Sequence, residues 1–291
     1  MTDINTLLQQ EPSADSADDV MEWFEELQNK IDRGDMMIGL ISSEELDIVP
    51  EALKFAAKGG IKEAWMSLAF WLMDEEDDKG ADKALMEAVE NNITDAMLLI
   101  AEHRWFLRKD NCTDQEKKEA YELLNKYNDE KKDDSEGIYL KGLITCGGFG
   151  TKEDPIAAVE LQKKAAEMDN SRALFELYVH YSTGLGVDID NDKALKYNID
   201  AAELGHPRAL YNMGAFYATG KLVEKDITKA VEFYTDAVDE GSGLAAATLA
   251  VMYAIGEDID KDIEKAEDLF DEAEYLGFDT EKYRHMAGLD N

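Results

Sequence analysis

The sequence predicts an all-α protein, an α-solenoid of stacked helix-turn-helix repeats. Three observations predict it. About half of the chain repeats itself at a period of 36 residues, apolar residues within each copy recur at four-residue spacing, and Asp and Gly stand where helices should begin and end. A period of this length is typical of solenoids, in which each helix pair buries its apolar face only against neighbouring pairs.

The repeat is defined by residue types that recur at the same place in each copy. The same pattern continues 36 residues upstream, where Gly142, Gly148 and Asp154 stand at the corresponding positions. The sequence therefore predicts four repeats, over residues 137–172, 173–208, 209–244 and 245–280. The recurring positions are Ala173, Ala209 and Ala245; Tyr181, Tyr217 and Tyr253; Gly184, Gly220 and Gly256; and Asp190, Asp226 and Asp262.

Each repeat reads as two helices. Ala173, Leu177 and Tyr181 lie on one face of a first helix, which Gly184 is placed to end. The second helix follows an Asp that can act as its N-cap; in the first repeat this Asp precedes Pro155, a residue suited to the first helical position. The glycines that close the second helices suit left-handed C-caps. They are Gly205, Gly241 and Gly277.

The repeats resemble the Sel1-like repeat family, which is related to the tetratricopeptide repeats. The resemblance is carried by the pattern Ala-x3-Leu/Met-Gly/Ala-x2-Tyr-x2-Gly, a short loop with Val, Asp-x2-Lys-Ala, and Ala-Ala/Val-x2-Gly, and it is best over residues 209–220. The resemblance implies a right-handed α/α superhelix that binds other proteins. It implies no catalytic residue.

The remaining segments are assigned from composition and from weaker matches to the repeat. Residues 1–19 are polar and acidic and are expected to be disordered. Residues 20–63 are expected to form N-terminal capping helices, with an amphipathic helix from Val20 to Ile31, and residues 64–136 two divergent repeats. Residues 281–291, with a short helix from Glu281 to Ala287, are expected to cap the C-terminal end.

The chain carries 65 acidic and 30 basic residues, a formal net charge of -35. This charge disfavours direct nucleic-acid binding, because each phosphate contact would form in a repulsive field. Many acids fall in the loops between paired helices, where stacking would align them as an acidic edge. Two explanations stay open: solubility with helix capping, or steering of a basic protein partner. The residues of the expected edge are Asp154, Asp188, Asp190, Asp192, Glu224, Asp226, Asp258 and Asp260.

Other classes of function find little support. Acids alternate from Asp188 to Asp192 as in the start of an EF-hand loop, but Lys193 stands where the loop needs Gly and Ile199 where it needs Glu. The histidines form no catalytic motif, and the two cysteines, Cys112 and Cys146, show no metal spacing. We expect no cofactor, metal or small-molecule substrate. No apolar run could span a bilayer and no signal peptide is evident, so a cytoplasmic location is expected.

A variable stripe on the first helices is the candidate partner-binding groove. Its aromatic and Met side chains are of the types enriched at interface centres, and the alternative is that half or more of them pack against the neighbouring repeat. The candidate residues are Trp71, Tyr139, Phe175, His180, Tyr211, Phe216 and Met252.

These observations favour a non-enzymatic module that binds and inhibits a basic protein, for example as an immunity protein or antitoxin against a cationic toxin. The alternative is a regulatory adaptor or scaffold that assembles several proteins. An enzyme is the third possibility, and His180 would then be the residue to mutate.

Overall fold

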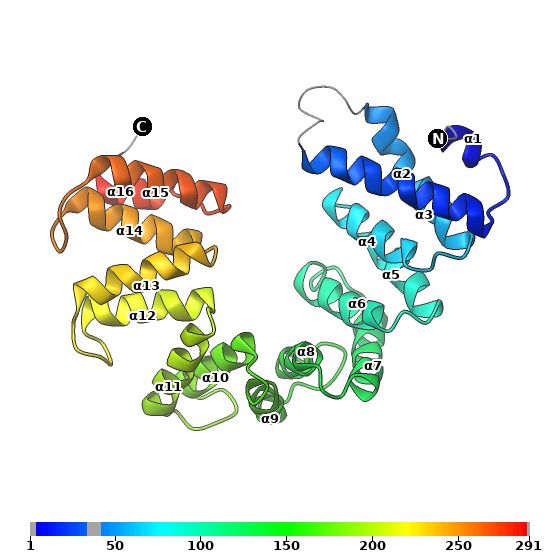
Figure 1. Ribbon diagram of the computed structural model, residues 1–291. Helices are drawn as coiled ribbons and strands as arrows, with labels where there is room; N and C mark the ends of the chain where they lie inside the picture. Colours follow the sequence, from blue (N-terminus) through cyan, green and yellow to red (C-terminus); the bar gives the residue numbers. More distant parts are fainter. Residues whose placement is uncertain (1–3, 34–41, 290–291) are drawn as a thin grey trace. The chain divides into compact units, whose positions relative to one another are not determined.

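The computed structural model describes residues 4–33 and 42–289, in which all regular secondary structure is α-helical (Figure 1). The predicted all-α class is confirmed for this part of the chain. Parts of three expected segments lie outside the described residues: residues 1–3 of the N-terminal segment, 34–41 of the capping helices, and 290–291 of the C-terminal cap.

The chain divides into two compact units, one formed by residues 1–132 with 149–152 and the other by residues 133–148 with 153–291. Within the described residues, consecutive helices of each unit pack against one another, except that the last helix packs mainly against the one two before it. The helices of the first unit are α1 (Ile4–Leu7), α2 (Ala14–Asp32), α3 (Ser43–Lys58), α4 (Ala64–Asp74), α5 (Asp78–Glu90), α6 (Asp95–Phe106) and α7 (Asp114–Glu130). Those of the second unit are α8 (Ser135–Cys146), α9 (Pro155–Ala166), α10 (Ser171–Thr183), α11 (Asn191–Glu203), α12 (Pro207–Thr219), α13 (Ile227–Asp239), α14 (Gly243–Ile255), α15 (Ile263–Tyr275) and α16 (Glu281–Ala287).

The recurring aspartates cap the second helix of each pair. The carboxylates of Asp154, Asp190, Asp226 and Asp262 accept hydrogen bonds of 2.9 to 3.1 Å from the backbone N–H three residues on. Such a side chain satisfies one of the N–H groups that a helix start leaves without a partner. This local role explains the recurrence of Asp without any ligand.

The loops between paired helices also follow one design. The first helices α10, α12 and α14 end at Gly184, Gly220 and Gly256, which have φ values of 79°, 72° and 73°. Glycine adopts this left-handed conformation without the steric cost that a Cβ brings. Each loop is then closed by a backbone hydrogen bond from the capping Asp to a first-helix residue, as from Asp190 to Tyr181 at 2.9 Å.

Small residues let the paired helices approach closely. Ala173, Ala209 and Ala245 are fully buried. At Gly214 a Cβ would lie 2.6 Å from the ring of Tyr234, so the glycine is required by that ring. The repeat core thus alternates small residues on one helix with large ones on its partner, which gives the dense packing of protein interiors.

The N-terminal segment differs from the expected disorder. In its described part, Ile4 and Leu7 of α1 are buried, and α2 begins at Ala14 rather than at Val20. Ser13 caps α2, since its side chain accepts from the Ser16 N–H while the Ser16 side chain accepts from the Ser13 N–H. The acidic composition concealed this cap and the apolar contacts of α1.

Candidate functional site

The first helices of the second unit form a groove of about 400 Å³. α10 and α12 contribute most of the lining, and Ser242 and Leu244 at the start of α14 complete it. The lining combines aromatic rings, hydroxyl and amide groups and one charged side chain. Its residues are Phe175, Tyr178, Val179, Ser182, Thr183, Arg208, Tyr211, Asn212, Ser242 and Leu244.

The aromatic side of the groove is built on Phe175. Its ring stacks on the His206 imidazole, with centroids 4.5 Å apart and an interplanar angle of 10°, and the Arg208 guanidinium lies 4.8 Å from the ring centre. Tyr178 packs against the same ring at 5.5 Å. Burial, with the charges of Arg208 and Arg172, lowers the pKa of His206 to about 4. His206 is therefore neutral at pH 7, and the charge on this wall is that of Arg208.

Several polar lining groups already have partners. The hydroxyls of Ser182 and Thr183 donate to the Val179 carbonyl of their own helix, at 3.1 and 2.7 Å. The Asn212 amide donates to the Asn198 side chain at 3.0 Å. These hydrogen bonds fix the polar side chains of the wall. The groups left to contact a ligand are aromatic rings and the Arg208 guanidinium.

Two of the seven expected groove residues, Phe175 and Tyr211, line this groove, Tyr211 as a half-buried side chain and Phe175 as the floor of the wall, only 4% exposed. Tyr139, His180 and Phe216 are buried, with exposed fractions of 6%, 2% and 7%, so they pack between helices. His180 Nδ1 lies 2.7 Å from the Leu185 carbonyl, and burial lowers its pKa.

The other two expected residues are half-buried and lie elsewhere. Trp71 belongs to the first unit, where it packs edge-on against Phe24 at 6.1 Å. Met252 packs into the core of the second unit.

Tyr178 and Arg208 were missed by the sequence analysis. Tyr178 stands where the preceding and following repeats have Gly142 and Gly214. In those repeats the glycine makes room for a large residue on the second helix, whereas the second helix of this repeat carries the smaller Asn198 instead. The sequence signal for this position was that Tyr178 replaces the small residue of the repeat pattern.

The residues of the expected acidic edge lie in the loops between paired helices, except Asp192 in the first turn of α11, and all but the half-buried Asp190 and Asp226 are exposed. Asp154, Asp190 and Asp226 are helix caps, and Asp258 pairs with Lys225 at 3.2 Å, a contact that joins the loops of two neighbouring repeats. Among the described residues, no Lys, Arg or His lies within ion-pair distance of the other four. They are Asp188, Asp192, Glu224 and Asp260.

A family model now matches the helix pairs just described. The Sel1 repeat model matches residues 131–170, 171–206, 207–242 and 243–278, more than half of the chain. The chain belongs to the Sel1 repeat family. The last three matches begin at the first residues of α10, α12 and α14, so each covers one helix pair.

Solved structures show the same fold. A Sel1 repeat protein from Oxalobacter formigenes is 27% identical over 72% of this chain and 83% of that one, with a TM-score of 0.57. A protective antigen of uropathogenic Escherichia coli with the Sel1-like repeat fold is 23% identical over 78% of this chain and 49% of that one, with a TM-score of 0.55. An immunity protein from Pseudomonas aeruginosa is 22% identical over 80% and 84%, with a TM-score of 0.54. No curated protein matches significantly in sequence.

The fold of this Sel1 repeat protein is therefore an α-solenoid of consecutive helix pairs. Sel1 repeats are protein-interaction repeats and are generally non-catalytic binding modules. In the described residues no group of three His, Cys, Asp or Glu side chains could hold a metal ion. No helix of that part is both long and apolar enough to cross a membrane.

Outside the Sel1 repeats, the first unit holds a buried ionic network that the sequence analysis missed. Arg104 of α6, 2% exposed, donates from Nε and Nη2 to the two oxygens of Asp82 on α5, at 2.7 and 2.9 Å, and from Nη1 to Glu119 on α7 at 2.8 Å. Arg108, 5% exposed, pairs with Asp82 at 2.9 Å and Glu116 at 3.0 Å. The network joins three helices where the repeat pattern is weakest.

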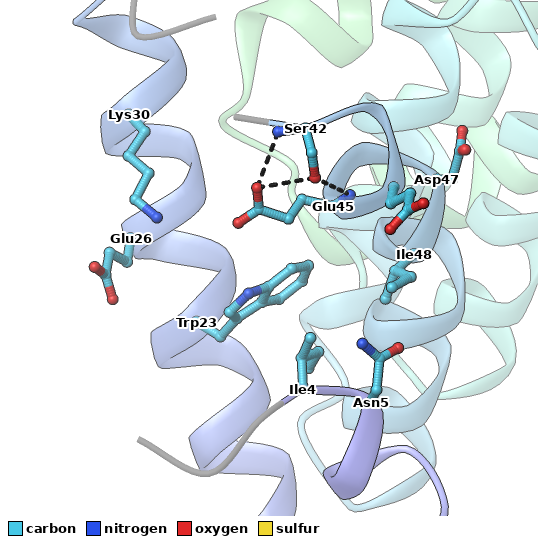
Figure 2. Close-up of a pocket in the computed structure, with 10 residues that line it drawn as sticks. Ile4, Asn5, Trp23, Glu26, Lys30, Ser42, Glu45, Asp47 and Ile48 are labelled. Atoms are coloured by element: carbon cyan, nitrogen blue, oxygen red, sulfur yellow. Dashed lines mark hydrogen bonds between the residues drawn. The ribbon is translucent and has the colours of Figure 1, made fainter. Parts of the chain in front are cut away.

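Figure 2 shows a further pocket, of about 670 Å³, in the same unit. Trp23 projects from α2 toward α3, and most of the charged side chains around it are acidic. The reciprocal hydrogen bonds between Ser42 and Glu45, at 2.9 and 3.2 Å, cap α3. Because these polar groups serve the helix start, the groove on α10 and α12 is the stronger candidate site.

Proposed function

We propose that this Sel1 repeat protein is a non-catalytic module that binds and inhibits a basic partner protein, as an immunity protein or antitoxin would inhibit a cationic toxin. The observation that carries the proposal is the net charge of -35 together with four exposed carboxylates that have no cationic partner among the described residues. Asp188, Asp192, Glu224 and Asp260 serve no cap and no described ion pair, so their charge is available to a partner.

The two surfaces act at different stages of binding. Long-range acidic charge raises the rate of encounter with a basic protein, because opposite potentials steer diffusion. Aromatic surface in the groove, mainly that of the half-buried Tyr178 and Tyr211, slows dissociation, since aromatic anchors dominate the binding energy of interfaces. Phe175 is only 4% exposed and supports the wall from beneath Arg208.

The immunity protein from Pseudomonas aeruginosa supports the choice of inhibitor as the concrete form of this module. The likeness is one of fold, at 22% identity and a TM-score of 0.54. It supports inhibition as the form of the proposal, and the partner's charge is inferred from this chain's own residues.

The alternative is an adaptor that assembles several proteins without inhibiting them. The separate acid-rich pocket around Trp23 in the first unit favours this alternative, since it offers a second binding surface.

Capture experiments distinguish the two. The tagged chain is incubated with extract of its native cells at low salt, and bound proteins are eluted with rising salt, identified and assayed. A one-to-one complex in which a basic partner loses its activity supports inhibition. A ternary complex with active components supports the adaptor, and elution of acidic proteins alone would overturn the basic-partner proposal.

A further inference from the structure

One position on the first helices forms a series from repeat to repeat. The second residues of α8, α10, α12 and α14 are Glu136, Arg172, Arg208 and Leu244, each 36 positions from the next. In this fold the side chain at that position reaches back over the aromatic residue of the preceding first helix. Arg172 lies 4.9 Å from the ring centre of Tyr139, and Arg208 lies 4.8 Å from that of Phe175.

The two arginines differ in charge compensation. Arg172 pairs with Glu136, the residue one step back in the series. The residue 36 positions before Arg208 is Arg172, and the residue 36 positions after it is Leu244. Arg208 thus has no acid in the series to pair with, and among the described residues no carboxylate approaches it within ion-pair distance.

The titratable groups around Arg208 form no ion pair with it among the described residues. Glu176 on α10 is the acid that it influences, but burial raises the pKa of Glu176 and the charge of Arg208 lowers it less. Tyr178 is a neutral phenol whose pKa is raised by burial, and His206 is neutral at pH 7. In a chain with a net charge of -35, Arg208 is a cation with no ion-pair partner among the described residues, exposed at the wall of a groove.

We propose that this groove binds an acidic side chain, Asp or Glu, presented by an extended segment of the partner, with its carboxylate on Arg208. This inference rests on the proposed function and names the recognition chemistry of the same site. The guanidinium is already oriented by Phe175, so little side-chain entropy is lost when it donates two hydrogen bonds to a carboxylate. The aliphatic stem of the acidic residue lies against Tyr178 and Tyr211.

The acidic residue is expected within a basic or neutral segment. An isolated carboxylate approaching the groove meets the repulsive field of the whole chain, and flanking Lys or Arg residues offset this repulsion. The partner can therefore be basic overall and still depend on one acid.

A peptide selection tests this chemistry without knowledge of the partner. The full chain is used to select from a display library of random 12-residue peptides fused at their C-termini, so that no free terminal carboxylate is present. We expect enriched peptides to share one Asp or Glu near an apolar residue. A synthetic enriched peptide should bind at least tenfold more weakly to R208Q and to its own Glu→Gln or Asp→Asn version.

R172Q is the matched control, because Arg172 also stacks on an aromatic ring but already has a carboxylate; we expect its affinity for the peptide to change less than threefold. R208K keeps the charge and should lose part of the affinity. Because Arg208 is exposed, the melting temperature of R208Q should match that of the original chain.

Enriched peptides without an acidic residue, equal binding to R208Q, or no enrichment would overturn this inference. None of these outcomes bears on salt-dependent capture of a basic protein, so the two proposals fail separately.

Discussion

The Asn198 side chain on α11 donates a hydrogen bond of 3.1 Å to the Ala209 carbonyl on α12, which joins one repeat to the next. Asn198 is fully buried, and its Oδ1 accepts from the Asn212 amide at 3.0 Å. A buried amide satisfied on both sides stabilises the interface and also fixes how the two helix pairs meet.

We expect Asn198→Ala to lower the free energy of unfolding by about 1–3 kcal/mol, because it leaves the Ala209 carbonyl and the Asn212 amide without this partner. Urea unfolding followed by circular dichroism measures the change. Asn191→Ala, at an exposed position on the same helix, should cost less than about 0.5 kcal/mol. Equal effects of the two substitutions would show that the buried amide contributes nothing specific.

Breaking the ionic network of the first unit should be more costly. Arg104→Met leaves Asp82 buried beside one remaining arginine, and removal of one partner from a buried pair typically costs about 3–5 kcal/mol. All four tryptophans lie in this unit, so tryptophan fluorescence reports its unfolding. Lys83→Met, an exposed change on the helix that carries Asp82, is the control and should leave the transition unmoved.

The same network predicts acid sensitivity. Burial raises the pKa of Asp82, but contacts with His103 and Arg104 and the charges of Arg104 and Arg108 together outweigh burial. The pKa of Asp82 therefore lies well below its usual range. A carboxylate with a depressed pKa in the folded state contributes stability above its unfolded pKa of about 3.9 and loses it as the pH falls further. Tryptophan-detected stability should therefore decline below about pH 4, and less steeply in Asp82→Asn. A slope unchanged by that substitution would contradict the assignment.

His206 gives the second unit a different pH dependence. Its pKa of about 4 lies below the unfolded value of about 6.5, so the fold favours the neutral ring, and this contribution is present above pH 6.5 and lost toward pH 4. His206 is the N-cap of α12, and its Nδ1 accepts a hydrogen bond from the Ala209 N–H at 3.4 Å. Asn is a good N-cap without a titratable group. We expect the stability of His206→Asn, relative to the original chain, to improve as the pH falls from 7 to 4.5. A constant difference by circular dichroism would exclude the depressed pKa.

Substitutions of Phe216 and Tyr211, both on α12, distinguish a residue that packs in the core from one that lines the groove. Phe216 is 7% exposed, so Phe216→Ala should cost about 3–5 kcal/mol of unfolding free energy as core truncations do. Tyr211 is half-buried at the groove, so Tyr211→Ala should lower the free energy of unfolding clearly less. Thermal melts of both variants measure this, and a reversed order would show that the groove assignment of Tyr211 is wrong.

Much of the fold could be predicted because the repeat is written in local residue types. The recurring Asp and Gly act within a few residues of themselves, as caps and left-handed turns, so their roles follow from spacing alone. The Arg104 network could not be predicted in this way, because its members are brought together from α5, α6 and α7 by packing, and no short-range pattern links them.

The groove was predicted only in part for a related reason. A first helix contacts both its own partner helix and the next repeat, so Phe216 and His180 are buried although they vary between repeats. Variation alone does not distinguish a contact with a ligand from a contact with a neighbour. Comparing Arg208 with Arg172 required the structure, since only the contacts show which arginine has a carboxylate.

Steering by the acidic loops can be measured with charge-neutral variants that spare the helix caps. Asp188→Asn, Asp192→Asn, Glu224→Gln and Asp260→Asn are combined in one chain, leaving Asp190 and Asp226 to cap α11 and α13. We expect the association rate with the captured partner to fall severalfold at low salt while the dissociation rate changes little, because rim charges act mainly on encounter. A change confined to dissociation would contradict steering.

The most direct test of the central claim is the association rate of the captured partner measured from 0.1 to 1 M salt. The screening length shortens from about 10 Å to about 3 Å over this range. If the net charge of -35 steers a basic protein to the Sel1 repeats, the rate should fall steeply with salt while the dissociation rate changes much less. An association rate indifferent to salt, or one that rises with it, would contradict the account.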